Sequence, residues 1–354
     1  MKLRIFFKFF AVLLVFSISL GIVCSCSFSL KRRYTDYSFD YFDTVTSVIG
    51  FEVNKNSFDK TSRRIMSMIS EYHKLFDIYH GYEGINNLYT INKEKGTAEN
   101  PIKVSADLIE FLEFAIDCHE KTDGNVNIAM GSVLSLWHTE RERAKANPNG
   151  ARLPDADALS KAAEHTDISG IVINKEKSTV YLADANTLLD VGAIAKGYAV
   201  EKIAKALLAE GITGYVINVG GNVRTLGAMN DGSLWQVGVE NPDKSNAEKP
   251  YVQTLALKGE SLVTSGSYQR FYSVNGINYH HIIDKDTNYP AEGYLSVSVV
   301  ANDSGIADAL STALFCVSVE QGREILSRFE NTEVMWVLQD GSIRYSDGFA
   351  KYRA

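Results

Sequence analysis

The chain has 354 residues and a formal net charge of −7, and it contains no stretch in which basic and aromatic residues are interleaved. This charge gives no sign of a nucleic-acid-binding surface. With 45% hydrophobic and 22% charged residues, the composition is that of an ordinary globular protein, which can bury a sizeable core in one large or two smaller domains. We find neither an internal repeat nor a low-complexity tract.

Residues 1–25 are predicted to be a signal sequence rather than part of the fold. Basic residues precede the apolar run Phe9–Val23, which is too short for a comfortable membrane span. The run ends in Val23-Cys24-Ser25-Cys26, which resembles a bacterial lipobox because a small residue directly precedes a cysteine. We therefore expect a lipid anchor on Cys26 and a location on the extracytoplasmic face of the cell membrane. The alternatives are a plain secretory signal and an uncleaved anchor.

A polar and aromatic tether is expected at 26–41, followed by a single folded domain at 42–354. In chain order, apolar residues spaced three and four apart predict helices at 57–76, 105–122, 155–163, 194–211, 304–317 and 319–329. Short or alternating apolar runs bounded by turn residues predict strands at 43–51, 170–174, 179–182, 188–191, 214–219, 223–226, 234–239, 252–257, 268–274, 277–284, 296–301, 334–338 and 343–345.

Helices and short strands are mixed along the chain, so an α+β fold with mixed or antiparallel sheets and flanking helices is predicted. A loop rich in glycine and asparagine is expected at 80–92, and an exposed excursion at 140–154. Asn275-Gly276 predicts a type I′ turn between two strands. Cys118 and Cys316 lie on apolar helical patterns and are expected to be buried thiols rather than a disulfide or a zinc site.

The segment Leu188–Gly227 is the centre of the argument about function. A strand end brings Asp190 into a glycine turn, a helix follows, and the next strand ends in Gly220-Gly221-Asn222. Glycine lets the backbone approach a ligand closely, and free N–H groups near a helix start suit phosphate. An ordinary crossover with glycines for tight packing is the alternative. It explains Lys196 poorly, because a cation is unfavourable in the first turn of a helix, so we interpret Lys196 as kept for an anion.

The helix predicted at 304–317 contains a second candidate. Asp308 and Thr312 are four residues apart and therefore share one face. A carboxylate and a hydroxyl beside an apolar stripe suit a hard cation that prefers oxygen ligands, above all Mg²⁺. The alternative, equally compatible with this helix alone, is that Asp308 faces solvent and Thr312 bonds to its own helix backbone.

The third candidate is Tyr279–Asp284, which contains two adjacent histidines. Successive side chains of a strand point to opposite faces, so His281 and Ile283 would share one face, and Ile282 and Asp284 the other. A histidine on a sheet edge beside a bound phosphate can act as a general base. The alternative is two partly exposed histidines at the end of a strand.

Taken together, five motifs resemble those of the ApbE family, the FAD:protein FMN transferases, and the likeness runs from about Phe42 to Val317. The motifs are Asp190-Val-Gly-Ala-Ile-Ala-Lys196-Gly-Tyr, Asn218-Val-Gly-Gly-Asn222, Thr264-Ser265-Gly266-Ser-Tyr268, His281-Ile-Ile-Asp284 with Tyr289-Pro290, and Ala307-Asp308-Ala-Leu-Ser-Thr312. The resemblance implies an ApbE-like architecture related to the T-fold, with the FAD site in a cleft between subdomains.

The resemblance also implies a reaction and its residues. The family binds FAD and Mg²⁺, splits the flavin pyrophosphate, transfers FMN to a threonine or serine hydroxyl of a target flavoprotein, and releases AMP. By motif position, Mg²⁺ would be held by Asp308, Thr312 and the backbone carbonyl of Ala193, and His281 would take the proton from the target hydroxyl. FAD, as the substrate, would be contacted by Phe42, Tyr79, Asn125, Val126, Asn127, Asp190, Lys196, His281 and Ile282.

Several positions depart from the family pattern. Asn127 stands where the family usually has Asp, and Asn222 replaces a common acid. A second histidine precedes His281, and Lys285-Asp286-Thr287-Asn288 replaces the usual Pro-Arg-Thr-Gly. Because none of these changes removes a predicted metal ligand, an active enzyme is expected.

Two other functions compete with the transferase. One is a lipoprotein that binds FAD, or hydrolyses its pyrophosphate, without modifying a protein; a chain that only binds FAD has no need of His281. The other is a non-enzymatic surface interaction protein, which would leave Asp190, Lys196, Asp308 and Thr312 unexplained together.

Overall fold

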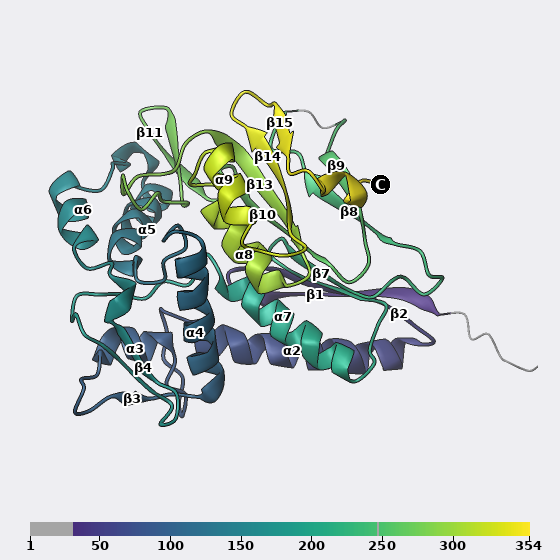
Figure 1. Cartoon of the computed structure of the whole chain (residues 1–354), viewed down its shortest axis with the longest axis horizontal. Coiled ribbons are helices and arrows are strands. Elements are labelled where there is room, and N and C mark those ends of the chain that lie inside the picture. The colour runs from purple at the N-terminus through teal and green to yellow at the C-terminus, as the bar shows by residue number, and fades with distance from the viewer. Residues whose placement is uncertain (1–30, 246–247) are drawn as a thin grey trace, which may run out of the picture.

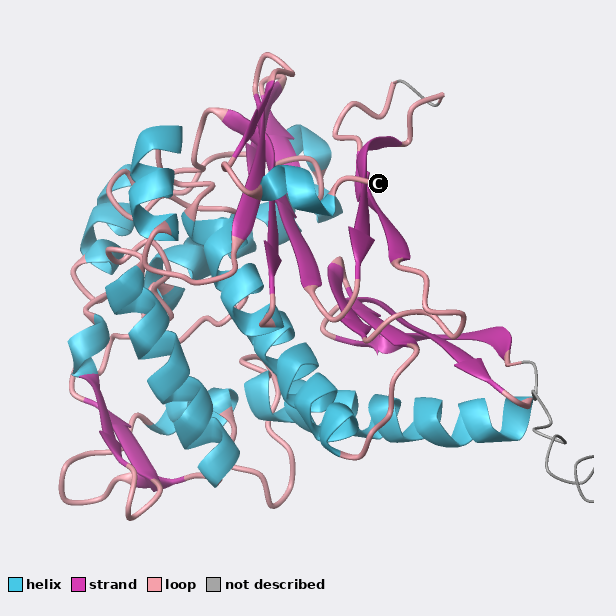
Figure 2. Ribbon diagram, turned by 45° about the vertical axis from the view of Figure 1, so that its right-hand side comes forward, coloured by secondary structure: helices cyan, strands magenta, loops and turns pink. Residues whose placement is uncertain are grey.

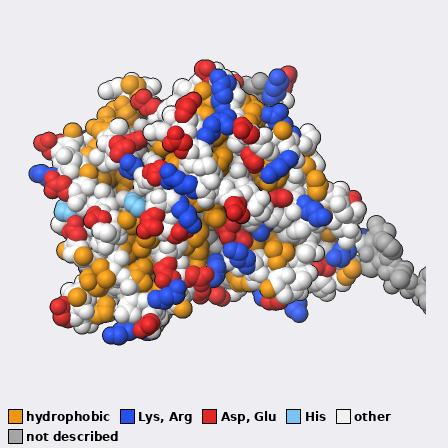
Figure 3. Space-filling view, viewed as in Figure 1, with side chains coloured by type: hydrophobic (Ala, Val, Ile, Leu, Met, Phe, Trp, Pro, Cys, Tyr) orange, Lys and Arg blue, Asp and Glu red, His pale blue; other side chains and the backbone are white. Residues whose placement is uncertain are grey.

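The computed structural model describes residues 31–245 and 248–354. The predicted signal sequence and Cys26 lie outside the described residues. Within the described ranges, no helix is both long and apolar enough to cross a membrane. On the face shown in Figure 3, acidic and basic side chains are interspersed rather than segregated.

The described residues form a central eight-stranded sheet in which each neighbouring pair is antiparallel (Figure 1). In order across the sheet, the strands are β1 (Arg32–Tyr41), β2 (Thr44–Glu52), β6 (Tyr215–Val219), β7 (Asn222–Leu226), β10 (Ser261–Gly266), β13 (Tyr294–Ala301), β14 (Glu333–Leu338) and β15 (Ile343–Tyr345). The predicted α+β class with antiparallel sheets is therefore confirmed.

Helices cover one face of this sheet, namely α2 (Lys55–Phe76), α7 (Ala195–Ala209), α8 (Ser304–Ala313) and α9 (Val319–Leu326). The apolar stripes of α2 and α7 are buried against β2 and β6, and those of α8 and α9 against β13 and β14. α7 and α8, which lie far apart in the sequence, also contact each other. This contact is where the candidate site is assembled.

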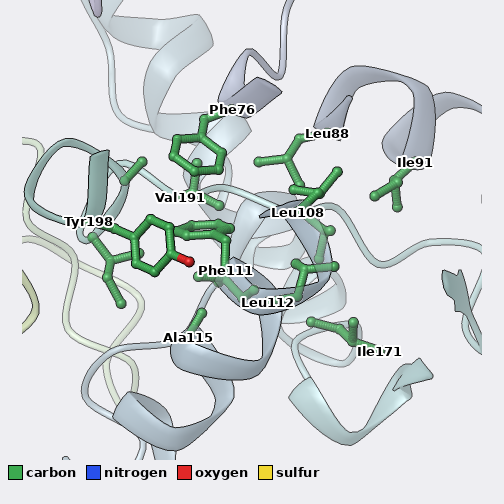
Figure 4. Close-up of a cluster of buried hydrophobic side chains, with 14 of the residues drawn as sticks. Phe76, Leu88, Ile91, Leu108, Phe111, Leu112, Ala115, Ile171, Val191 and Tyr198 are labelled. Atoms are coloured by element: carbon green, nitrogen blue, oxygen red, sulfur yellow. The ribbon is translucent and has the colours of Figure 1, made fainter. Parts of the chain in front are cut away.

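A helical lobe lies beside the sheet (Figures 1 and 2). It consists of α3 (Leu88–Glu94), β3 (Ile102–Lys103), α4 (Ala106–Lys121), α5 (Gly131–Ala146), α6 (Ala156–Ala163), β4 (Ile171–Asn174) and β5 (Thr179–Leu182). The start of α7 shares the core of this lobe: the Tyr198 ring lies edge-on to the Phe111 ring, with 5.1 Å between centroids (Figure 4). The shared core fixes the first turn of α7 against the lobe.

Two hairpins complete the fold. β8 (Trp235–Glu240) and β9 (Tyr251–Leu257) cover the other face of the sheet together with a short 3-10 helix at Phe349–Tyr352. β11 (Phe271–Val274) and β12 (Ile277–His280) form the hairpin that precedes His281. Its turn residues Asn275 and Gly276 both have positive φ, 52° and 83°, as the predicted type I′ turn requires.

Residues 32–41, which we expected to belong to the tether, form strand β1 instead. β1 pairs with β2, and one of its faces packs on α2: the Tyr34 and Phe58 rings stack at 5.5 Å, and the Ser62 hydroxyl donates a hydrogen bond to Asp36 (2.7 Å). The mixed polar and aromatic composition is that of an edge strand with one exposed face. The folded unit therefore begins near residue 32 rather than at 42.

Other local predictions were also wrong. The expected loop at 80–92 includes the start of α3, and the expected excursion at 140–154 includes the end of α5. β10 was not predicted, and 188–191 is extended with a single bridge between Met130 and Leu188 rather than a regular strand. α5 was missed because one of the positions on its buried face is a charged residue, Glu140.

Candidate active site

The turn that begins at Asp190 is fixed by the burial of its neighbours. Leu189 and Val191 are buried in the lobe core, whereas Asp190 lines a surface pocket. The Asp190 carboxylate accepts a hydrogen bond from the Gly192 N–H (2.9 Å), which closes the turn. Burial raises the pKa of Asp190, and the Gly192 N–H opposes this rise.

α7 and α8 touch at Gly197. A Cβ atom at this position would lie 2.2 Å from the Ser304 carbonyl oxygen and 2.4 Å from Asp308 Cβ. Only glycine therefore lets the two helices approach this closely. The contact places the turn at 190–194 beside the helix that contains Asp308 and Thr312, so the two segments that the sequence linked to a single metal ion meet.

The Asp308 carboxylate is buried at this contact, with 5% of its side chain exposed. Its Oδ2 accepts a hydrogen bond from the Gly197 N–H (2.8 Å) and lies 3.8 Å from Lys196 Nζ. Burial raises the pKa of Asp308, whereas the Lys196 charge, the Gly197 N–H and the Asn222 side chain lower it. The Asn222 amide nitrogen is buried and has no hydrogen-bond partner of regular geometry among the described residues. A desolvated carboxylate with a single lysine at this distance favours a further cation.

The Ala193 carbonyl lies at the start of α7. The helix begins only at Ala195, and the Gly197 N–H donates to Asp308 rather than to the carbonyl four residues earlier, at Ala193. The Ala193 carbonyl is thus without its regular helical donor. This oxygen is therefore available as a ligand, and its role in holding Mg²⁺, which the family resemblance implies, stays a prediction.

Thr312, the remaining predicted ligand, lies one turn after Asp308 on α8 and is half-buried. Its hydroxyl lies 3.4 Å from the Ser265 hydroxyl, which in turn lies 2.8 Å from that of Ser311. No group of three or more His, Cys, Asp or Glu side chains suited to a metal occurs among the described residues. A carboxylate, a hydroxyl and a carbonyl are nevertheless the oxygen donors that Mg²⁺ prefers, so the residues present fit this ion.

His281 follows directly after β12, at the base of the hairpin, and not within the strand that the sequence predicted. Its backbone N–H and its Nδ1 lie 3.1 and 3.2 Å from the Arg270 carbonyl oxygen. A carbonyl can only accept, so Nδ1 holds the proton and Nε2 keeps its lone pair. Burial lowers the pKa of His281 to about 3, helped by the Arg270 charge. The imidazole is therefore neutral at neutral pH, while the next residue, Ile282, is buried.

Phe42 lies in the tight turn between β1 and β2, where Phe42 and Asp43 both have positive φ, 54° and 49°. The Phe42 N–H donates to His73 Nδ1 (3.3 Å), and the two rings meet edge-on at 5.4 Å. The Arg270 guanidinium donates to the Asp43 carbonyl (3.2 Å). The turn that contains the predicted flavin contact Phe42 is thus hydrogen-bonded to Arg270, whose carbonyl oxygen in turn holds His281.

A pocket of about 300 Å³ opens beside Asp190. The rings of Tyr79 and His138 face it with 5.4 Å between centroids and an interplanar angle of 33°. Tyr79, a predicted FAD contact, is 51% exposed, so its ring can accept an aromatic ligand. The complete lining is Ile78, Tyr79, Tyr89, Asn92, Lys93, Gly131, Ser135, His138, Thr139, Leu188, Leu189 and Asp190.

The Asn125–Asn127 turn uses its side chains for internal hydrogen bonds. Val126 is buried, and the Asn125 amide donates to the Thr122 carbonyl (2.9 Å). The Asn127 amide nitrogen donates to the Thr166 carbonyl (2.8 Å), and its oxygen accepts from the Ala129 N–H (2.9 Å). An aspartate at position 127 could not donate the bond to the Thr166 carbonyl, which gives a local reason for Asn127 in place of Asp. Contacts of this turn with FAD stay a prediction.

Two sets of residues near the site escaped the sequence analysis. Glu201 on α7 forms a buried ion pair with Arg224 on β7 (2.9 Å) and accepts the Ser304 N–H at the start of α8 (2.9 Å). The available signal was a charged residue among the buried positions of an apolar helix. The other set, His138 and Arg141, lies on α5, which was not predicted as a helix.

The fold and the site together define an α+β protein in which a buried carboxylate, a lysine and a glycine turn meet at a helix–helix contact beside an aromatic pocket. The sequence profile of the ApbE family matches residues 37–336. The chain therefore belongs to the ApbE family, and the resemblance found in its motifs is confirmed.

Relatives and solved structures agree with this assignment. The chain is 34% identical over 275 residues to an FAD:protein FMN transferase of Treponema pallidum, covering 74% of this chain and 73% of the relative. It is 27% identical over 324 residues to the same-named protein of Haemophilus influenzae, covering 91% and 88%. The crystal structure of the ApbE protein from Thermotoga maritima matches with a TM-score of 0.78 and 25% identity, covering 91% of this chain and 100% of that one. The flavin transferase ApbE from Vibrio cholerae shares the fold, with a TM-score of 0.72 and 21% identity over 91% and 99% of the two chains.

Proposed function

We propose that this chain transfers FMN from FAD to a threonine or serine hydroxyl of a target flavoprotein and releases AMP. Its family membership and its relatives named FAD:protein FMN transferase support this reaction. The structural observation that supports it most is the contact at Gly197, where Asp308, Lys196 and the turn after Asp190 meet. Each of these groups has a role in handling a diphosphate.

We assign a Mg²⁺ site to Asp308, Thr312 and the carbonyl of Ala193. When bound, the ion supplies Lewis acidity and neutralises charge on the diphosphate oxygens. The burial of Asp308, the Ala193 carbonyl that lacks the Gly197 N–H as donor, and the oxygen-only donor set support the assignment. Lys196, whose ammonium donates to the Gly192 carbonyl (3.2 Å), holds a further positive charge at the same turn.

His281 is the proposed general base. The acceptor hydroxyl oxygen forms a bond to the phosphorus of the FMN half, and the bond from that phosphorus to the bridging pyrophosphate oxygen breaks, so that AMP leaves with the bridging oxygen. The proton of the hydroxyl moves to Nε2 of His281, which is free because Nδ1 is held by the Arg270 carbonyl. A positioned general base accelerates such a step by about 10²–10⁴-fold when its pKa lies near the working pH.

A binder or hydrolase of FAD is the alternative function. It would share the pocket and the metal site but would not use a base to activate a protein hydroxyl. Incubation of the chain from residue 27 onward with FAD, Mg²⁺ and a flavin-acceptor domain separates the two. Covalent yellow fluorescence on a denaturing gel supports the transferase, whereas free AMP and FMN without a labelled acceptor support the hydrolase.

Variants test the assigned roles in the same assay. His281→Ala should keep FAD binding and lose transfer, and His165→Ala, a lobe histidine paired with Asp184, is its control. Asp308→Ala should abolish Mg²⁺-dependent turnover while the fold stays intact. Asp347→Ala, in which a fully exposed carboxylate is removed, is the matched control. Unchanged turnover in Asp308→Ala would contradict the role of Asp308 as a metal ligand. Unchanged transfer in His281→Ala would contradict the role of His281 as general base.

We also propose that Cys26 is lipidated and anchors the enzyme on the extracytoplasmic face of the bacterial membrane. The lipobox-like sequence before Cys26 supports this. The acceptor would then be a membrane-associated or extracytoplasmic flavoprotein. Metabolic labelling with a radioactive or clickable fatty acid should mark the wild-type chain and not Cys26→Ala; equal labelling of both would contradict the anchor.

A further inference from the structure

Arg141 is a nearly buried guanidinium whose ion pair among the described residues is long. Its side chain is 14% exposed, and the nearest carboxylate contact is from its Nε to Glu142 Oε1 at 3.7 Å. Glu142 is half-exposed and is shared with Lys145, whose Nζ lies closer, at 2.7 Å. A nearly buried arginine is normally held by anions at hydrogen-bond distance, because a poorly paired buried charge is unfavourable. A long pair with a shared carboxylate leaves Arg141 able to bind a further anion.

His138 is the hydrogen-bond partner that holds Arg141. The Arg141 Nη2 donates to His138 Nδ1 at 2.7 Å, which fixes the guanidinium one turn further along α5 from the imidazole. Because arginine only donates, Nδ1 accepts and the neutral imidazole holds its proton on Nε2. Burial lowers the pKa of His138, and the Arg141 charge lowers it further, which keeps the imidazole neutral.

The same face of α5 lines the Asp190 pocket. Gly131, Ser135 and His138 all line that pocket, at spacings of four and three residues. The Gly131 N–H donates to the Leu188 carbonyl (2.9 Å), which clamps the start of α5 to the segment that leads to Asp190. Arg141 follows three residues after His138 on this face of α5, and it adjoins the pocket through its hydrogen bond to His138, which lines it.

The charge of Arg141 affects the pKa of three residues of the candidate active site. Burial raises the pKa of Asp190 and raises that of Tyr79 to about 12, and the Arg141 charge opposes both shifts. Burial lowers the pKa of His281, and the Arg141 charge adds to this effect. Arg141 is therefore close enough to Asp190, Tyr79 and His281 for its charge to act on each of them.

We propose that Arg141, oriented by His138, binds a phosphate group of the dinucleotide in the Asp190 pocket. The inference rests on the proposed function, since that function supplies the dinucleotide. A planar guanidinium fork matches two phosphate oxygens, which an ammonium cannot do. Arg141 would thus add a fixed charge from α5 to the one that Lys196 holds on α7.

Binding of FAD and of riboflavin to the full chain in detergent tests the proposal. Riboflavin has the flavin ring but no phosphate. Arg141→Ala should weaken FAD binding by about ten- to a hundred-fold, the effect of losing a charged hydrogen bond, and leave riboflavin binding unchanged. Arg141→Lys should recover part of the loss, because the charge stays and the fork does not. Lys145→Ala, which removes an exposed cation from the same helix, should change neither affinity.

Equal weakening of FAD and riboflavin in a folded Arg141→Ala would overturn the proposal, since it would make Arg141 a structural residue. Unchanged FAD affinity would also overturn it. The circular dichroism spectrum of each variant checks the fold, and Arg141→Lys keeps the test valid if the alanine variant unfolds. Transfer of FMN to a protein is measured separately on the wild-type chain, so its failure would refute the proposed function without touching the phosphate-specific binding result.

Discussion

Replacement of Gly197 by alanine tests how closely α7 and α8 must approach. In a helix interior, glycine to alanine is by itself favourable by about 1 kcal/mol. Here the new Cβ would lie 2.2 Å from the Ser304 carbonyl oxygen and 2.4 Å from Asp308 Cβ. Neither atom can rotate away, so the cost is at the upper end of the roughly 1–3 kcal/mol typical of overpacking, which leaves a net loss of about 2 kcal/mol.

The urea midpoint of Gly197→Ala measures this loss, and a Mg²⁺ titration of its turnover measures the displacement of Asp308. Both the midpoint and the apparent Mg²⁺ affinity should fall. Gly170→Ala is the control, because no atom lies within 4 Å of its added Cβ, and it should match the wild type. A Gly197→Ala protein with the wild-type midpoint and the wild-type Mg²⁺ response would refute the reasoning.

The remaining predictions concern Glu201 and His281. Glu201→Gln should lower the free energy of unfolding by about 3–5 kcal/mol, because it leaves the Arg224 charge buried without its counter-charge; an unchanged urea midpoint would contradict this. With a pKa of about 3, His281 is neutral from pH 5 to 8, so kcat/KM should show no acid limb near the ordinary histidine pKa of about 6.5. An acid limb of kcat/KM at about pH 6.5 that disappears in His281→Ala would contradict the prediction that His281 is neutral in this pH range. The unfolded chain protonates His281 below about 6.5 and the folded chain only near 3, so the residue has no effect on stability at higher pH and destabilises the fold as the pH falls between these values. Urea midpoints of the wild type and of His281→Ala, each at pH 7 and pH 5, measure this effect. An equal difference between the two proteins at both pH values would contradict it.

The sequence predicted the elements whose buried faces are mostly apolar. The strong helical spacing of α2, α4 and α7 and the short apolar strands β6 and β14 fall where their patterns placed them. β1 escaped because an edge strand with an exposed face has no continuous apolar signal. α5 escaped because Glu140 occupies a buried position, where Arg143 and Arg152 neutralise it.

The assembly of the candidate site could not be predicted in this way, because the spacing of apolar residues along the chain does not indicate which distant helices contact each other. Asp308 and Gly197 are 111 residues apart, and the bond between them exists only because a glycine on α7 lets α8 approach. From the α8 pattern alone, Asp308 was equally compatible with an exposed position. The family motifs brought these segments together, whereas Arg141 and Glu201 lie outside those motifs and became visible only in the structure.

The central claim is that this chain moves FMN from FAD onto a protein, and the stoichiometry of a single reaction tests it most directly. The chain is incubated with FAD, Mg²⁺ and an acceptor domain, AMP is quantified, and the mass of the acceptor is measured. The account predicts one molecule of AMP for each acceptor that gains the mass of FMN less one water, with both signals absent when Mg²⁺ is chelated. Release of AMP together with free FMN, from an acceptor of unchanged mass, would contradict it.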